Sequence, residues 1–138
     1  MEEKFRRTVD ALEGVFTFVS EFAARHRLGP DVLFQVKLAI EEIFVNMVRH
    51  NTGTNDILVS LAREEDKLIV SLTDFDVEAF DITKVEDYDT RQPLRRRPVG
   101  RLGIHLVRRV ADRVSYDYKN RQSRVTFVKN LEKTDVQD

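Results

Sequence analysis

The sequence predicts an α/β domain of the α+β kind: a two-layer sandwich with a mixed, mostly antiparallel sheet and helices on one face. Two long segments with helical apolar periodicity follow each other near the N-terminus, and two pairs of alternating apolar segments come later. The chain has 138 residues, which is the size of one domain. We therefore expect a single domain over residues 1–138, in the order β-α-α-β-β-loop-α-β-β.

The N-terminal part is expected to form a short strand and two helices. The strand is predicted over Phe5 to Val9. The first helix would have Asp10 as its N-cap, because Glu13 follows three residues later as in a capping box, and would end near His26. Apolar residues at helical spacing predict a second helix over residues 31–50.

Two hairpins and a shorter helix are expected in the rest of the chain. Alternating apolar and polar residues predict strands over residues 57–61, 68–72, 114–118 and 123–128. Apolar residues on one side predict a helix over 100–111. Between 79 and 98 the pattern dissolves into charged and turn residues, which predicts a long loop of the kind that often has a function.

Composition excludes several kinds of site. The chain has no cysteine, which excludes disulfides, iron–sulfur and zinc-thiolate sites and a cysteine nucleophile. The net charge of −1 gives no reason to expect direct nucleic-acid or membrane binding. No signal peptide or membrane-spanning apolar run is visible, so the cytoplasm is the expected compartment. Only five glycines are present, which leaves few positions for a phosphate-binding loop.

The second predicted helix carries the first candidate site. Glu42, Asn46 and Arg49 share one stripe of this helix with Gln35, roughly opposite its apolar face. The stripe is either a solvated helix face or a site for chemistry. Asparagine is a mediocre helix former, but its amide oxygen is a neutral ligand suited to Mg²⁺. A glutamate one turn earlier can polarise a hydroxyl or a water molecule.

Two further candidates lie at element ends. Asp74 and Asp76 follow a predicted strand, where a carboxylate either accepts a hydrogen bond from a ligand amino group or simply opens a loop. Gly100 and Gly103 open the last predicted helix. Backbone N–H groups there either bind an anion or belong to an ordinary loop-to-helix junction.

In this order and spacing, the three segments resemble the N, G1 and G2 boxes of the GHKL ATPases, the superfamily of gyrase, the heat-shock chaperone, histidine kinases and MutL. Within it, the chain resembles the anti-sigma-factor serine/threonine kinases of the SpoIIAB and RsbW type. The resemblance covers nearly the whole chain, including residues 38–42 and 106–112. It implies the GHKL (Bergerat) ATP-binding fold, ATP and Mg²⁺ as cofactors, and a lid over about residues 82–99.

The resemblance also implies a role for each matching residue. Asn46 would hold Mg²⁺, Glu42 would be the general base, and Arg49 would lie near the phosphates. Asp74, or alternatively Asp76, would accept a hydrogen bond from the adenine amino group. The remaining nucleotide-binding residues would be those of the G2 segment, Gly100, Arg101, Leu102, Gly103 and Ile104. Arg101 replaces a usual glycine and either contacts phosphate or faces solvent.

The G1 segment departs from the family pattern. The family has Asp-x-Gly-x-Gly or Asp-x-Gly-x-x-Phe, whereas this chain has Asp76 in place of the first glycine and no second one. Two functional hypotheses follow. The first is an ATP-dependent serine kinase that phosphorylates a STAS-type anti-sigma-factor antagonist, sequesters a sigma factor and forms a homodimer. The second is a non-catalytic partner-switching module with a degenerate nucleotide pocket.

Overall fold

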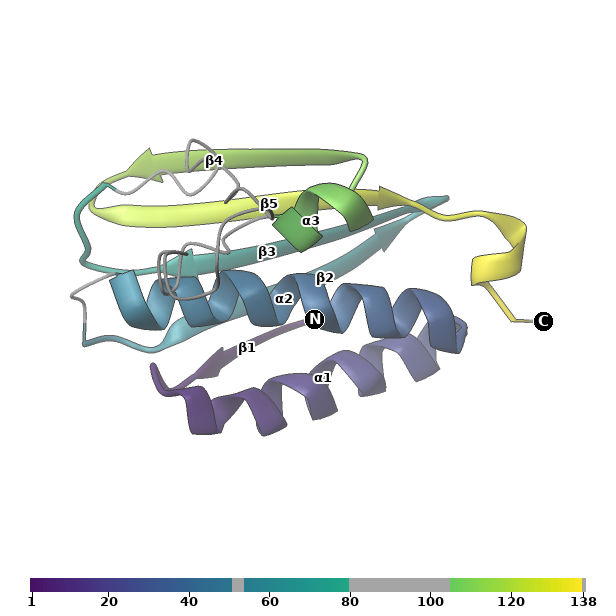
Figure 1. Ribbon diagram of the computed structural model, residues 1–138, viewed down its shortest axis with the longest axis horizontal. Helices are drawn as coiled ribbons and strands as arrows, with labels where there is room; N and C mark the ends of the chain where they lie inside the picture. Colours follow the sequence, from purple (N-terminus) through teal and green to yellow (C-terminus); the bar gives the residue numbers. More distant parts are fainter. Residues whose placement is uncertain (51–53, 80–104, 138) are drawn as a thin grey trace, which may run out of the picture.

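A five-stranded antiparallel sheet forms one layer of the protein (Figure 1). The structure is a computed structural model that describes residues 1–50, 54–79 and 105–137. Its strands are β1 (Glu2–Phe5), β2 (Ile57–Glu64), β3 (Lys67–Asp74), β4 (Arg113–Lys119) and β5 (Gln122–Asn130). They are arranged in the order β1-β2-β3-β5-β4, and every pair is antiparallel. The strand β3 is therefore central, and the edge strands are β1 and β4.

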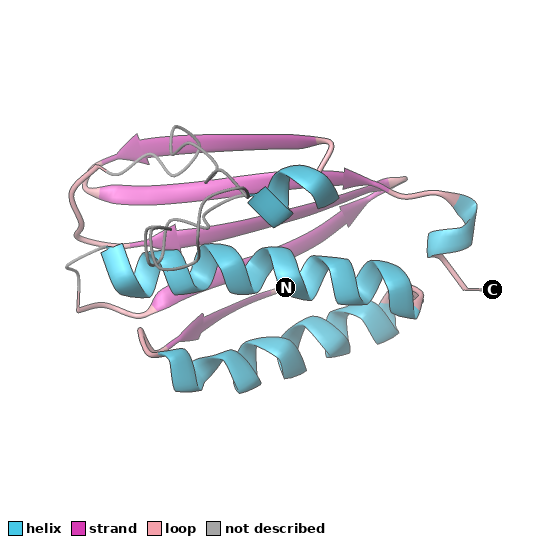
Figure 2. Cartoon of the chain, viewed as in Figure 1, coloured by secondary structure: helices cyan, strands magenta, loops and turns pink. Residues whose placement is uncertain are grey.

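The helices form the second layer, on one face of the sheet (Figures 1 and 2). They are α1 (Leu12–Arg25), α2 (Pro30–His50) and the short α3 (His105–Val110). Their apolar faces meet the inward side chains of the sheet in one hydrophobic core. In β3 the inward positions alternate as Leu68, Val70, Leu72 and Asp74, and all four are buried. The predicted two-layer architecture and element order are thus confirmed within the described residues.

The N-terminal prediction was wrong in its details. The first strand ends at Phe5, where it pairs with Ile57, and does not extend from Phe5 to Val9. The chain already turns at Arg6, whose carbonyl accepts a hydrogen bond from Thr8 N–H at 2.8 Å. Asp10 is not the N-cap of α1, because it lies inside a 3₁₀ turn, η1 (Val9–Ala11), that precedes the helix. A 3₁₀ start satisfies N-terminal donors with backbone carbonyls, so a side-chain cap is not required.

The other boundaries differ by a few residues. The helix α2 begins at Pro30, since proline is favoured in the first turn, where no backbone donor is needed. The strands β2 and β3 are longer than predicted because a two-residue turn, Glu65–Asp66, joins them directly. Residues 100–104 of the predicted last helix and residues 80–98 of the predicted loop lie outside the described residues. Over the described ranges, no helix is both long and apolar enough to cross a membrane.

His26, at the C-terminal end of α1, has an environment that disfavours its protonation. Its ring packs on Phe22 with 4.2 Å between ring centroids. Burial, followed by the positive charges of Arg63, the N-terminus and Arg25, lowers the pKa of His26 from 6.5. The folded chain therefore resists protonation of this ring more than the unfolded chain does.

We expect the free energy of unfolding to decrease on acidification through pH 6.5, because the unfolded chain then binds a proton that folded His26 resists. His26→Gln removes this titration, so it should reduce the stability difference between about pH 7.5 and about pH 5.5. Urea unfolding of both proteins at both pH values measures the difference. The same pH-dependent loss in the variant would contradict this assignment.

Candidate functional site

Glu42 and Asn46 lie one turn apart on α2, and Glu42 contacts α3. The Asn46 side chain donates its amide N–H to the backbone carbonyl of Glu42 at 2.8 Å, and the residue is only 6% exposed. The Glu42 carboxylate accepts the backbone N–H of Leu106, with N–O distances of 3.2 and 3.3 Å. Glu42 is therefore attached to the first turn of α3, which directly follows the predicted G2 segment in sequence.

The stripe on α2 is not a solvated helix face along its whole length. Gln35 and Arg49 are exposed, Glu42 is half-buried and Asn46 is buried. The helix α3 packs against α2 and contacts Glu42, which periodicity within α2 alone does not reveal. The structure thus brings Glu42 and Asn46 together in a shielded position and leaves Arg49 on the outside of the last turn.

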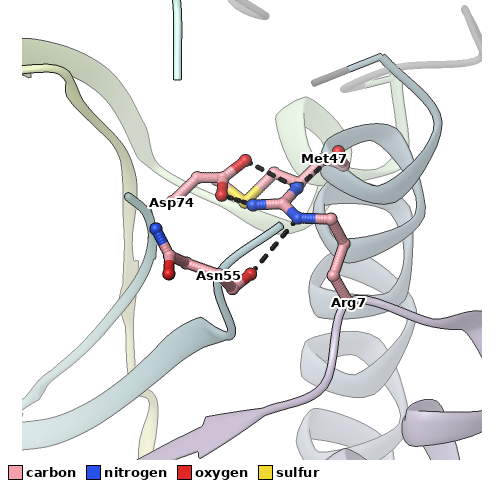
Figure 3. Close-up of polar contacts among 4 residues, drawn as sticks. All are labelled: Arg7, Met47, Asn55 and Asp74. Atoms are coloured by element: carbon pink, nitrogen blue, oxygen red, sulfur yellow. Dashed lines mark hydrogen bonds and ion pairs between the residues drawn. The ribbon is translucent and has the colours of Figure 1, made fainter. Parts of the chain in front are cut away.

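Asp74 lies at the inward end of the central strand and is fully buried, with 0% exposure. It forms a two-pronged ion pair with Arg7, which precedes α1 in the chain (Figure 3). The Arg7 Nη1 atom donates to Asp74 Oδ2 at 3.0 Å, and Nη2 contacts Oδ1. Both oxygens of the carboxylate that was predicted to bind adenine are therefore engaged by a guanidinium group.

The remaining donors of Arg7 join neighbouring segments to this ion pair. Nη1 also donates to the backbone carbonyl of Met47 at 3.0 Å, and Nε donates to the carbonyl of Asn55 at 3.2 Å (Figure 3). Only 9% of the Arg7 side chain is exposed. This burial lowers the pKa of Arg7, but a guanidinium group remains charged at neutral pH. Arg7 therefore connects β3, the last turn of α2 and the segment before β2.

Sequence reasoning missed Arg7. The usable signal was the alternation of β3, which places Asp74 on the same face as Leu68 and Leu72 and therefore in the core. A carboxylate at such a position requires a cation or several donors. The sequence offers many cations, and only the fold shows that the turn after β1 brings Arg7 to this place.

Asp76, the other candidate for the adenine amino group, faces solvent. Its side chain is 71% exposed and forms an ion pair with Arg121, with 2.9 Å between Oδ1 and Nε. Its φ of 53° lies in the left-handed region that favours glycine. The next residue, Val77, is buried and bound to the β4–β5 hairpin by Tyr118, whose hydroxyl donates to the Val77 carbonyl at 2.7 Å. The turn after β3 therefore has a left-handed, non-glycine residue at this position.

The rest of the predicted site lies outside the described residues. It comprises the predicted lid over 82–99 and the G2 residues Gly100, Arg101, Leu102, Gly103 and Ile104. Within the part of the chain that is described, no group of three or more histidine, aspartate or glutamate side chains could hold a metal ion. The described residues fit a nucleotide on one side only. The buried Asn46 amide suits the phosphate side, whereas Asp74 is closed to an adenine ring by Arg7.

Comparison with known proteins is consistent with this geometry. The histidine kinase-like ATPase domain family matches residues 5–129. A solved structure of the RsbU and RsbW domains of Rv1364c from Mycobacterium tuberculosis has the same fold, with a TM-score of 0.69 at 16% sequence identity. The match covers 95% of this chain but 32% of that chain, so this protein corresponds to about one third of the longer one. No curated protein matches the sequence.

The burial of the ion pair predicts unequal effects of two similar substitutions. Asp74→Asn keeps the shape of the side chain but leaves the Arg7 guanidinium buried without a counter-charge. We expect it to lower the free energy of unfolding by about 3–5 kcal/mol. Asp76→Asn is the matched control, because its ion pair is exposed and should contribute little. Denaturant unfolding of the three proteins measures both effects, and equal losses for the two variants would contradict the structural role of Asp74.

Proposed function

The chain belongs to the histidine kinase-like ATPase domain family, and we propose that it is an anti-sigma regulatory factor with ATP-dependent serine kinase activity. Its substrate would be a serine on a STAS-type antagonist protein. The unphosphorylated antagonist would release a sequestered sigma factor, and phosphorylation would restore sequestration. The regulator would act in the cytoplasm as a homodimer. The shared fold with a chain that contains RsbU and RsbW domains supports this class of regulator.

Two linked contacts carry this proposal: Asn46 is hydrogen-bonded to Glu42, and Glu42 is hydrogen-bonded to α3. Two polar side chains that resemble the catalytic pair of the N box are held by hydrogen bonds in a shielded position. Asparagine in a helix at 6% exposure gives little stability by itself. Their joint placement next to the start of α3, which follows the predicted phosphate-binding segment in sequence, is better explained by chemistry than by packing.

The residues of this pair would have distinct tasks. When bound, Mg·ATP would supply the phosphoryl group. Glu42 would accept the proton of the serine hydroxyl, while the Leu106 N–H, which already contacts both carboxylate oxygens, fixes its orientation. Asn46 would hold Mg²⁺ through its amide oxygen, with its amide nitrogen anchored on the Glu42 carbonyl. Positioning and charge neutralisation would then provide most of the rate enhancement.

A second candidate function rests on a different observation. The Arg7–Asp74 ion pair closes the adenine side, and Asp76 replaces a family glycine. Both features favour a non-catalytic partner-switching module that binds a sigma factor and an antagonist without using nucleotide. The two candidates differ in whether the chain transfers phosphate.

Phosphoryl transfer to a protein acceptor distinguishes the two. The purified chain is mixed with the STAS-type proteins of the source organism and with saturating Mg·ATP labelled at the γ-phosphate. Labelled phosphoserine should then form on one of these acceptors. Glu42→Gln should lower the rate at least about 100-fold, because it removes the base. It should leave nucleotide affinity within about twofold, because glutamine can still accept the Leu106 N–H.

Glu41→Gln is the matched control, since it removes a carboxylate from the adjacent helix position and should leave the rate unchanged. No transfer to any acceptor by the unmodified chain would overturn the kinase proposal. Stable binding of a sigma factor by that same inactive chain would then support the second candidate.

A further inference from the structure

The side chain that closes Asp74 lies 67 positions earlier in the sequence. Arg7 is located in the short segment between β1 and η1, and β1 fixes the start of this segment through the pairing of Phe5 with Ile57. From there the guanidinium reaches past Asn55 to the end of the central strand, as Figure 3 shows. Arg7, the cation of this ion pair, thus lies outside the predicted nucleotide boxes, whereas Asp74 lies within one.

The ion pair uses the same acceptor atoms that a purine would use. An adenine amino group and a guanidinium N–H are both nitrogen donors, and each needs a carboxylate oxygen. Arg7 engages both oxygens of Asp74, and the carboxylate is 0% exposed. A ligand amino group and Arg7 therefore cannot bind Asp74 in the same way at the same time.

We propose that Arg7 is an internal occupant of the base-binding part of the nucleotide site, and that its withdrawal from Asp74 sets the affinity for adenine nucleotides. This inference rests on the proposed nucleotide site and deepens it by naming the residue that limits its use. The apparent affinity then equals the affinity of the open form multiplied by the fraction of molecules in which Arg7 has left.

The local structure allows such a withdrawal without unfolding the core. Arg7 is flanked by the exposed residues Arg6 and Thr8, in a turn outside any helix or strand. Within the described residues, its hydrogen bonds beyond Asp74 go to the backbone carbonyls of Met47 and Asn55. Rotation of one long side chain would expose the carboxylate and return the guanidinium to water. The hydrophobic core would keep its packing.

Three probes separate the two sides of the site. Adenosine reports the base side alone, inorganic tripolyphosphate reports the phosphate side alone, and Mg·ATP reports both. In calorimetric titrations, Arg7→Met should bind adenosine and Mg·ATP at least about tenfold more tightly than the unmodified chain. This factor corresponds to an open fraction of about one tenth or less. Affinity for tripolyphosphate should change by less than about twofold. A general loosening of the fold would instead change the affinities for all three probes.

Two further variants keep the test decisive. Arg6→Met removes the same charge from the neighbouring exposed position and should leave all three affinities unchanged. Arg7→Met leaves a buried carboxylate without its counter-charge, so the double variant Arg7→Met/Asp74→Asn removes both charges and should unfold closer to the unmodified chain. The asparagine oxygen can still accept an amino group, so this double variant should also bind adenosine more tightly.

The outcomes distinguish this inference from the kinase proposal. Adenosine affinity within about twofold of the unmodified chain in both Arg7 variants, or no detectable binding in any protein, would overturn it. Tighter adenosine binding without phosphoryl transfer would support the role of Arg7 and overturn the kinase. Phosphoryl transfer by the unmodified chain, with no gain in nucleotide affinity in Arg7→Met, would support the kinase and overturn the role of Arg7.

Discussion

A carboxylate at the inward end of the central strand is the constraint on which this corner of the fold depends. Asp74 occupies a position that the strand pattern reserves for apolar side chains, and it is completely buried. An unpaired charge there would be strongly destabilising. The Arg7 guanidinium meets this requirement and also donates to the carbonyls of Met47 and Asn55. One ion pair thereby fixes the relative positions of the first turn, the end of α2 and the segment before β2.

The edge strand β1 determines the position of Arg7. It is short and mostly exposed, and its contribution to the core is small. Its pairing with β2 nevertheless determines where the following turn lies, and therefore where Arg7 points. The strand thus positions the turn that carries Arg7. Local β-propensity does not contain this information, since the benefit comes from a residue two positions beyond the strand.

The sequence was sufficient for the architecture and for the placement of Glu42 and Asn46 on one stripe of α2. Periodicity identified both long helices and both hairpins, because each follows from contacts between neighbouring residues. The pairing of Glu42 with Asn46 followed from helix geometry. Two features could not be predicted, for one reason. The contact of Glu42 with Leu106 depends on α3, and the partner of Asp74 depends on the turn after β1, so both need contacts between segments more than 50 residues apart.

The turn after β3 indicates how the departure from the family pattern is accommodated. A left-handed residue with a side chain is strained by about 1–2 kcal/mol relative to glycine, although aspartate tolerates this conformation better than most. Asp76 nevertheless keeps φ at 53°, with its carboxylate on Arg121, and Val77 remains tied to Tyr118. The turn after β3 is therefore left-handed at a residue that carries a side chain. The Asp76–Arg121 ion pair and the Tyr118 hydrogen bond tie this turn to the β4–β5 hairpin in a conformation that glycine would adopt more easily.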